Sequence, residues 1–211
     1  MIVNCYVAKN PQKKEDWMKK KILKKVFLPL FIIAVFFFTL TCVNFLDYQK
    51  PISFDKINQI TFADFRGLEF FQKSLYGNEH FAYVKTTIDY EIEKDSIKIE
   101  SFFHPSSSYV YNKKAFSNDL LRHEMYHFRI TELYVRIAKN KIAKLIKPPT
   151  EKIKDLIKET EKEENNFQIK YDDDTFHSYV ESEQKKYEKE IDSLLYLHSK
   201  FKNPKLYINE N

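Results

Sequence analysis

The chain has only two glycines, Gly67 and Gly77, among its 211 residues. Loops that cradle phosphate groups need several glycines close together, so nothing in the sequence supports a nucleotide-binding function. Cysteine is equally rare, and both cysteines, Cys5 and Cys42, precede the part of the chain with the composition of a globular domain. We therefore expect no disulfide framework in the domain, and any metal there must be held by nitrogen and oxygen ligands.

Most of the chain also lacks an excess of either charge. The formal net charge is +5, but residues 1–25 alone carry eight lysines and two acidic residues, which leaves the remaining chain at −1. A domain so close to neutral, without a basic stripe interleaved with aromatic residues, argues against a nucleic-acid partner. The lysines stand directly before an apolar segment, where basic residues set the orientation of a membrane segment.

That apolar segment, residues 26–46, contains no formal charge. Its length and the basic residues before it are typical of a signal peptide or a membrane anchor. It could be cleaved, lipidated at Cys42 or retained as a contact with the membrane. We expect the rest of the protein to lie outside the cytoplasm, secreted or anchored, with residues 47–56 as a linker and residues 57–211 as one domain.

Hydrophobic patterning predicts a small sheet followed by helices. Apolar and polar residues alternate within residues 81–93 and 97–103, which is typical of a β-hairpin, and residues 60–67 are expected to form a short strand. Capping residues, apolar stripes and prolines predict three helices, with an acidic turn before the last: residues 118–147, 150–166 and 176–199. The expected fold class is α+β, a small antiparallel β-sheet packed on about three α-helices.

The first of these helices contains the pattern H-E-x-x-H, formed by His123, Glu124 and His127. Residues four apart lie one turn apart on the same face of a helix, so both imidazoles can hold one metal ion. Glu124 is then close enough to act on a water beside that ion without being a ligand. This is the zincin-like arrangement of zinc-dependent peptidases, and it predicts a Zn²⁺ site.

A catalytic zinc site needs a third protein ligand. Glu132, nine residues after His123, lies on the opposite side of the helix, so we expect it to pair with Arg136 or to hold a neighbouring helix. His177 is the best candidate, because it is expected to begin the third helix on the stripe that faces the core. The alternatives that stay open are Asp172, Asp173, Asp174 and Glu181.

Three segments together resemble a bacterial family catalogued as a domain of unknown function and described as predicted secreted zinc-dependent proteases. They are residues 60–67, residues 123–136 around the H-E-x-x-H pattern, and residues 171–177 with their Tyr-Asp and Thr-x-His pairs. The resemblance implies that His177 is the third zinc ligand. This chain departs from the family at Arg129, where Asp is frequent, and at Ser178, where Gly is usual.

The first functional hypothesis is a zinc metallopeptidase that acts on peptide or protein substrates. Zn²⁺ held by His123, His127 and His177 would polarise the scissile carbonyl, and Glu124 would take a proton from water and pass it to the leaving amine. An edge of the predicted hairpin would bind an extended peptide as an added strand. Candidates for stabilising the oxyanion are Tyr171, Tyr179 and His104.

The alternative hypothesis belongs to another class of protein. It is a membrane-tethered binding or scaffold protein without catalytic activity, in which the histidines hold a structural metal or none. The departures at Arg129 and Ser178 motivate it.

Overall fold

The computed structural model describes residues 25–37, 44–67, 82–111 and 117–208. The chain divides into two compact units, Met1–Cys42 and Val43–Asn211. In the first unit, residues 25–37 form an α-helix with exposed apolar side chains. Across the ranges just given, no helix has both the length and the apolar character that a membrane crossing requires. Residues 38–43 of the predicted apolar segment lie outside the described residues.

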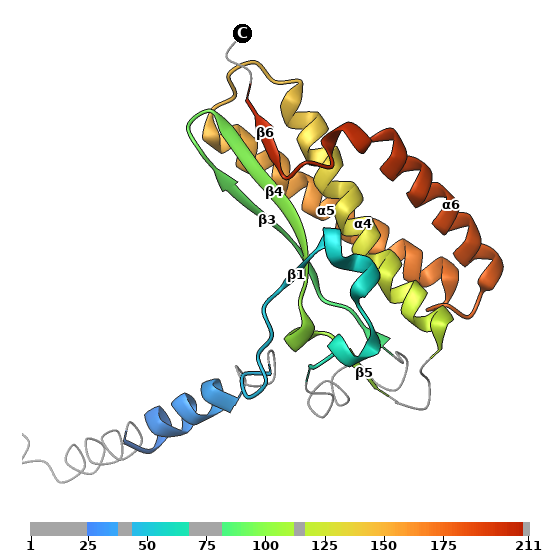
Figure 1. Ribbon diagram of the computed structural model, residues 1–211. Coiled ribbons are helices and arrows are strands. Elements are labelled where there is room, and N and C mark those ends of the chain that lie inside the picture. Colours follow the sequence, from blue (N-terminus) through green and yellow to red (C-terminus); the bar gives the residue numbers. More distant parts are fainter. Residues whose placement is uncertain (1–24, 38–43, 68–81, 112–116, 209–211) are drawn as a thin grey trace, which may run out of the picture. The chain divides into compact units, whose positions relative to one another are not determined.

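The second unit has the predicted α+β architecture, with a small antiparallel sheet packed on three long helices (Figure 1). The main sheet contains β1 (Ile52–Ser53), β3 (Thr86–Ile92), β4 (Ser96–Phe103) and β6 (Lys205–Tyr207), and a second sheet pairs β2 (Ala82–Tyr83) with β5 (Tyr109–Val110). The helices are α4 (Asn118–Ala143), α5 (Thr150–Thr175) and α6 (Glu181–Leu197). Short 3₁₀ helices are η1 (Phe54–Gln59), η2 (Phe62–Asp64), η3 (Pro105–Ser107) and η5 (Ser199–Phe201).

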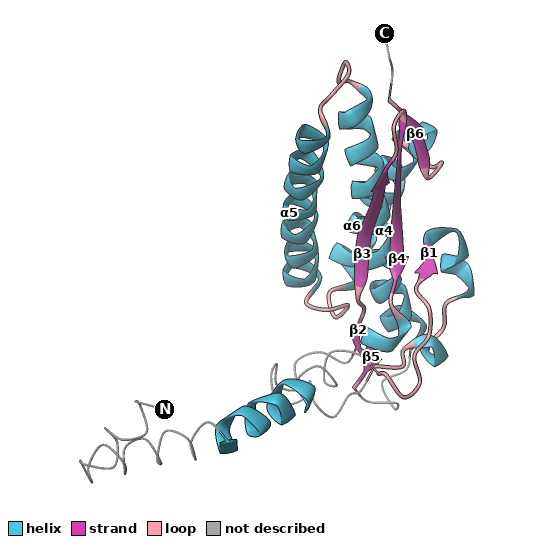
Figure 2. Ribbon diagram, turned by 90° about the vertical axis from the view of Figure 1, so that its left-hand side faces the viewer, coloured by secondary structure: helices cyan, strands magenta, loops and turns pink. Residues whose placement is uncertain are grey.

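The β3–β4 hairpin confirms the predicted strand pair. The two strands are antiparallel, with Thr86 opposite Phe103 and Ile92 opposite Ile97. Strand β4 is central, because β3 pairs with one of its edges while β1 and β6 pair with the other. Alternate β4 residues are buried against the helices, as expected for a strand with one covered face, and Figure 2 shows β3 and β4 running along the helical layer.

Helix α4 is the centre of the domain. It begins where predicted, because the Ser117 hydroxyl accepts a hydrogen bond from the Leu120 amide and caps the helix. Its Val135, Ala138 and Ile142 pack with β4 and the start of α5, and its Ile130 packs with α6. Helix α4 is therefore buried on several sides, with both the sheet and the other two long helices packed against it.

Two local predictions in the first half of the domain differ from the structure. The strand predicted for residues 60–67 is wrong: the segment forms η2, because the side chains of Thr61 and Asp64 cap each other's backbone amides and close a helical turn. The segment interpreted as a linker, residues 47–56, already contains β1 and the start of η1.

The helix boundaries after α4 also differ. Helix α4 ends at Ala143, before the predicted residue 147, and α5 runs on to Thr175, so the acidic turn predicted after residue 166 is wrong. Three aspartates at a helix C-terminus oppose the helix dipole, which favoured a turn. Tertiary contacts overcome this cost, since Asp172 pairs with histidines of α4 and Asp174 accepts a hydrogen bond from Tyr187.

Candidate metal centre

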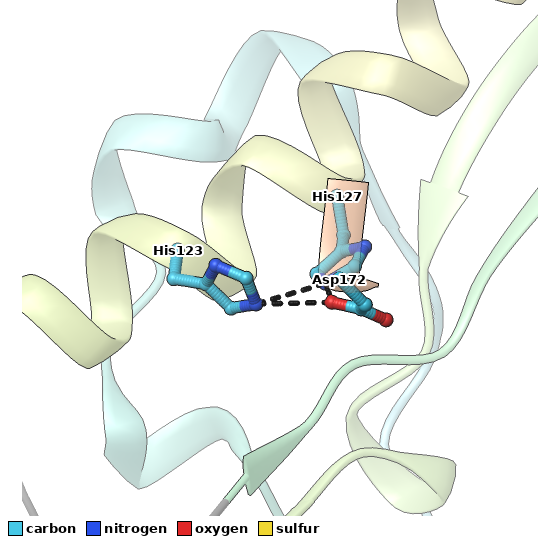
Figure 3. Close-up of side chains that lie close together, drawn as sticks. All are labelled: His123, His127 and Asp172. Atoms are coloured by element: carbon cyan, nitrogen blue, oxygen red, sulfur yellow. Dashed lines mark hydrogen bonds and ion pairs between the residues drawn. The ribbon is translucent and has the colours of Figure 1, made fainter. Parts of the chain in front are cut away.

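Two neighbouring helices bring three ligand-type side chains together. His123 and His127 lie one turn apart on α4, and Asp172 comes from the last turns of α5 (Figure 3). The two Nε2 atoms are 3.3 Å apart. Asp172 Oδ1 lies 3.2 Å from His123 Nε2 and 2.9 Å from His127 Nε2. Within the described ranges this is the group whose donor atoms all lie within 4.8 Å of one another.

These separations fit a tetrahedral zinc site. Zinc bonds to imidazole nitrogen and carboxylate oxygen are about 2.0–2.2 Å long, so donor atoms at two corners of a tetrahedron lie roughly 3.3 Å apart. The two separations that involve His123 Nε2, 3.3 and 3.2 Å, match this value. The His127–Asp172 separation of 2.9 Å is shorter, as expected for a direct ion pair in the metal-free protein.

The second nitrogen of each histidine is held by a glutamine. His127 Nδ1 lies 2.5 Å from Gln168 Oε1, and His123 Nδ1 lies 3.0 Å from Gln184 Oε1. Gln168 comes from α5 and Gln184 from α6, so the three long helices all contribute to the centre. Both imidazoles thereby direct Nε2 toward the shared carboxylate.

Glu124 is buried next to the group, with 4% of its surface exposed. Burial raises the pKa of its carboxyl above the usual value, although the neighbouring His127 and His123 oppose this rise. No hydrogen bond or ion pair to its side chain is made by the described part of the chain. An acid that lines a cleft beside two metal-type ligands and has no partner is free to exchange protons with a molecule in that cleft.

Asp172 and His127 each shift the pKa of the other strongly. Burial of the His127 ring lowers its pKa, but the charge and hydrogen bond of Asp172 outweigh that effect and raise the pKa to about 9. Burial likewise raises the pKa of Asp172, and the histidines around it reverse the effect and hold the pKa well below the usual range. The charged form of His127 is therefore favoured, opposite an ionised Asp172.

His177 lies at the edge of the group. It was expected to begin a helix, which is wrong, because it lies in the turn between α5 and α6 with a left-handed backbone (φ 51°). Its Nδ1 is 3.4 Å from Asp172 Oδ1, and its side chain is 31% exposed. It approaches the same carboxylate as the two helical histidines, and its role as a zinc ligand stays a prediction.

The other residues considered as ligands have different partners. Asp173 is exposed, Asp174 accepts a hydrogen bond from Tyr187, and Glu181 pairs with Lys185. On the far side of α4, Glu132 forms the predicted ion pair with Arg136, at 2.8 Å. Its second oxygen accepts a hydrogen bond from Ser101 of β4, so it also joins the helix to the sheet.

A cleft of about 430 Å³ opens beside the metal group. Glu124, His127, Asp172 and His177 lie on its wall, together with Gln168 and Ile169 of α5, and the segment from Ala82 to Thr86 forms the opposite wall. Among the oxyanion candidates, Tyr171 is fully buried and its hydroxyl bonds to Gln184, while Tyr179 is exposed in the α5–α6 turn. The His104 ring bonds to Thr87, and neither of these residues is on the cleft wall.

Sequence reasoning did not find Gln168. A signal was present, because Gln168 and Asp172 are four residues apart and therefore share one face of a helix. That signal was hidden by the predicted end of the helix at residue 166. Arg129, which stands where Asp is frequent in the family that the sequence resembles, pairs with Asp192 of α6.

The group of His123, His127 and Asp172 could hold a metal ion. Comparison of the chain with models of known protein families, with curated proteins and with solved structures found no match, so the resemblance to predicted secreted zinc-dependent proteases stays a prediction.

Proposed function

We propose that this protein is a zinc-dependent peptidase. One observation carries the proposal: three donor atoms at tetrahedral separations lie next to a buried, unpartnered glutamate on the wall of one cleft. We take His123, His127 and Asp172 as the zinc ligands, because their donor atoms form the compact group. His177, the ligand expected from the sequence, would be an added or exchangeable ligand at the edge.

Bound zinc supplies Lewis acidity, which polarises a carbonyl and makes water a stronger acid. Glu124 takes the proton released from water and delivers it to the amine that leaves. Burial suits Glu124 to both steps, because it raises the pKa of the carboxyl. A carboxylate with a raised pKa is a stronger base toward water, and it holds the proton until the proton passes to the amine. Packing between α4 and α5 holds the three ligand side chains close together.

An extended peptide is the substrate class that best fits the cleft. The Lys85 amide donates to Ser108 Oγ, and the Lys85 carbonyl accepts from the His104 amide, so Lys85 directs its backbone groups into the protein. Strand β3, which begins at Thr86, pairs with β4 through one edge and with no other described strand, so its second edge is open beside the cleft that Thr86 lines. A peptide could pair there as an added strand.

The test is zinc content per full chain, compared with the variants His123→Ala, His127→Ala, Asp172→Ala and His177→Ala. We expect one zinc per chain in the unaltered protein and in His177→Ala, and loss of zinc in the other three. Loss in His177→Ala with retention in Asp172→Ala would make His177 the third ligand. A chain that binds no zinc would remove the proposal.

Catalysis is tested separately with Glu124→Gln and a peptide library. We expect unchanged zinc content and a rate of hydrolysis lower by about 10²–10⁴-fold, the usual contribution of a general base. Glu161→Gln, one turn before the cleft-lining part of α5, is the matched control. Zinc binding without any Glu124-dependent cleavage would instead favour the binding or scaffold protein.

We also propose that the domain acts outside the cytoplasm, either secreted or tethered through residues 26–46. The uncharged apolar segment and the lysines before it support this location. Fractionation of cells, with the mass of the mature N-terminus, would test it, and an uncleaved chain found only in the cytoplasm would contradict it.

A further inference from the structure

Hydrogen-bond partners of Gln168 decide which way its amide faces. Its Nε2 donates to Glu164 Oε1 at 2.7 Å and to the backbone carbonyl of His127 at 3.0 Å. Ionised carboxylates and carbonyls only accept hydrogen bonds, so the NH₂ end of the amide must face them. The remaining oxygen then faces His127 Nδ1, and that nitrogen must carry a hydrogen.

The same chain of partners occurs at the other histidine. Gln184 Nε2 donates to Glu188 Oε1 at 2.9 Å, and Gln184 Oε1 faces His123 Nδ1 at 3.0 Å. The Glu188 carboxylate forms an ion pair with Arg122, whose Nε lies 2.8 Å from Glu188 Oε1. With only 2% of Gln184 exposed, water cannot replace these partners.

The two histidines are held by the same sequence of hydrogen-bond partners. In each case, a glutamate one helical turn away from a glutamine orients the amide, and the amide oxygen holds Nδ1–H of a histidine so that Nε2 keeps its lone pair. We infer that Gln168 and Gln184, oriented by Glu164 and Glu188, are positioning residues that set the metal-binding tautomer of His127 and His123. This inference rests on the proposed metal site.

A neutral amide has a different effect from the carboxylate that often holds a metal-binding histidine. A carboxylate at Nδ1 makes the imidazole a stronger donor and adds negative charge next to the metal. Here the carboxylates of Glu164 and Glu188 bond to the glutamine amides and not to the histidines. The amides therefore set the tautomer, and the negative charges lie further from the metal. Zinc held by two neutral imidazoles and Asp172 would keep a net positive charge, which favours polarisation of a carbonyl.

The test compares zinc affinity of the full chain with Gln168→Leu and Gln184→Leu, using competition with a chelating dye. We expect each substitution to weaken zinc binding by roughly 10–100-fold, the range seen when an outer partner of a ligand is lost. Gln168→Glu and Gln184→Glu keep an acceptor at Nδ1 but place a carboxylate against Glu164 or Glu188, so recovery of affinity is expected in the paired variants Gln168→Glu/Glu164→Gln and Gln184→Glu/Glu188→Gln. Asn166→Leu, an amide-to-leucine change on the exposed face of α5, should have no effect.

Nitrogen-15 NMR of the imidazoles provides a readout that a merely structural role would not change. At pH 10, in an Asp172→Ala background that removes the competing acceptor at Nε2, His127 should carry its proton on Nδ1 and lose that preference when Gln168→Leu is added. Unchanged tautomers or unchanged affinity in the leucine variants would overturn the inference. A full chain that binds no zinc would remove the proposed function, while the tautomer measurement would still decide this inference.

Discussion

At the scale of single residues, protons would compete with the proposed zinc ion for His127. The pKa of about 9 means that this ring is protonated at neutral pH in the metal-free protein. Only the neutral ring can donate a lone pair, so zinc must displace the proton. The proton that Asp172 favours on His127 is therefore a cost to metal binding.

We accordingly predict that zinc affinity rises about tenfold per pH unit from roughly pH 6 to pH 8 and levels off above pH 9, where the ring is already neutral. Competition titrations at several pH values would measure the slope. Calorimetry in buffers of different ionisation enthalpy would count the released protons. An affinity that does not change over this range would contradict the prediction.

Lys139 carries a second perturbed proton, far from the cleft. It is 2% exposed and donates to the carbonyls of Phe201 and Asn203, and burial lowers its pKa from 10.5 to about 8. Between these values the unfolded chain holds the proton and the folded chain does not. The unfolded state therefore binds more protons, and stability gained from this residue rises with pH.

We predict a difference in the pH dependence of stability between the unaltered chain and Lys139→Met. From pH 7.5 to pH 10 the unaltered chain should gain about 2–3 kcal/mol of unfolding free energy relative to Lys139→Met, because its pKa shift is absent from the variant. Urea unfolding at both pH values measures it. Parallel pH dependence in the two proteins would show that Lys139 pays no such cost.

At the scale of secondary-structure elements, the local sequence pattern predicted those strands and helices that local interactions determine. The β3–β4 hairpin follows from alternation and α4 from its cap and apolar stripe, so His123 and His127 could be placed on one face without the fold. Asp172 and Gln168 reach the site only because α5 lies beside α4 in one particular register. Register depends on packing between helices, and a single sequence does not reveal it.

The turn between α5 and α6 carries strain. Phe176, His177 and Ser178 all have positive φ, at 45°, 51° and 76°, a region that costs residues with a Cβ free energy. Burial of Tyr171 and Thr175 before the turn, and of Gln184 after it, holds the two helix ends in place. The turn must therefore adopt the geometry that brings His177 back toward Asp172.

We predict that Ser178→Gly stabilises the protein by about 0.5–1 kcal/mol, since glycine adopts positive φ without the clash of a side chain. Ser193→Gly, inside α6, should have the opposite sign, because glycine weakens a helix interior by a similar amount. Chemical denaturation of both variants measures the two effects. Destabilisation by both changes would mean that the turn is unstrained.

At the scale of the whole domain, the candidate site lies where its two layers meet. One wall of the cleft comes from the helices, and the other from the segment that leads from β2 into β3. The α+β class was predictable because it depends on counting elements. The relative positions of the layers, and hence the cleft, depend on contacts between residues far apart in sequence.

Zinc should stabilise the whole domain by mass action if it binds only the folded chain. At a free zinc concentration 1,000 times the dissociation constant, we expect a gain of about 4 kcal/mol in unfolding free energy and a higher Tm. Differential scanning calorimetry with and without a chelator would measure it. His123→Ala, which lacks a ligand, is the control and should show no response to zinc.

His123 and Asp172 are 49 residues apart in the chain, and one ion would tie them together. The ion would then be a reversible crosslink between two helices, closing a long loop in a domain that has no cysteine with which to form a disulfide. A chelator would therefore do more than stop hydrolysis. By opening the crosslink it would expose the chain to degradation, so the supply of zinc would set the lifetime of the protein as well as its activity.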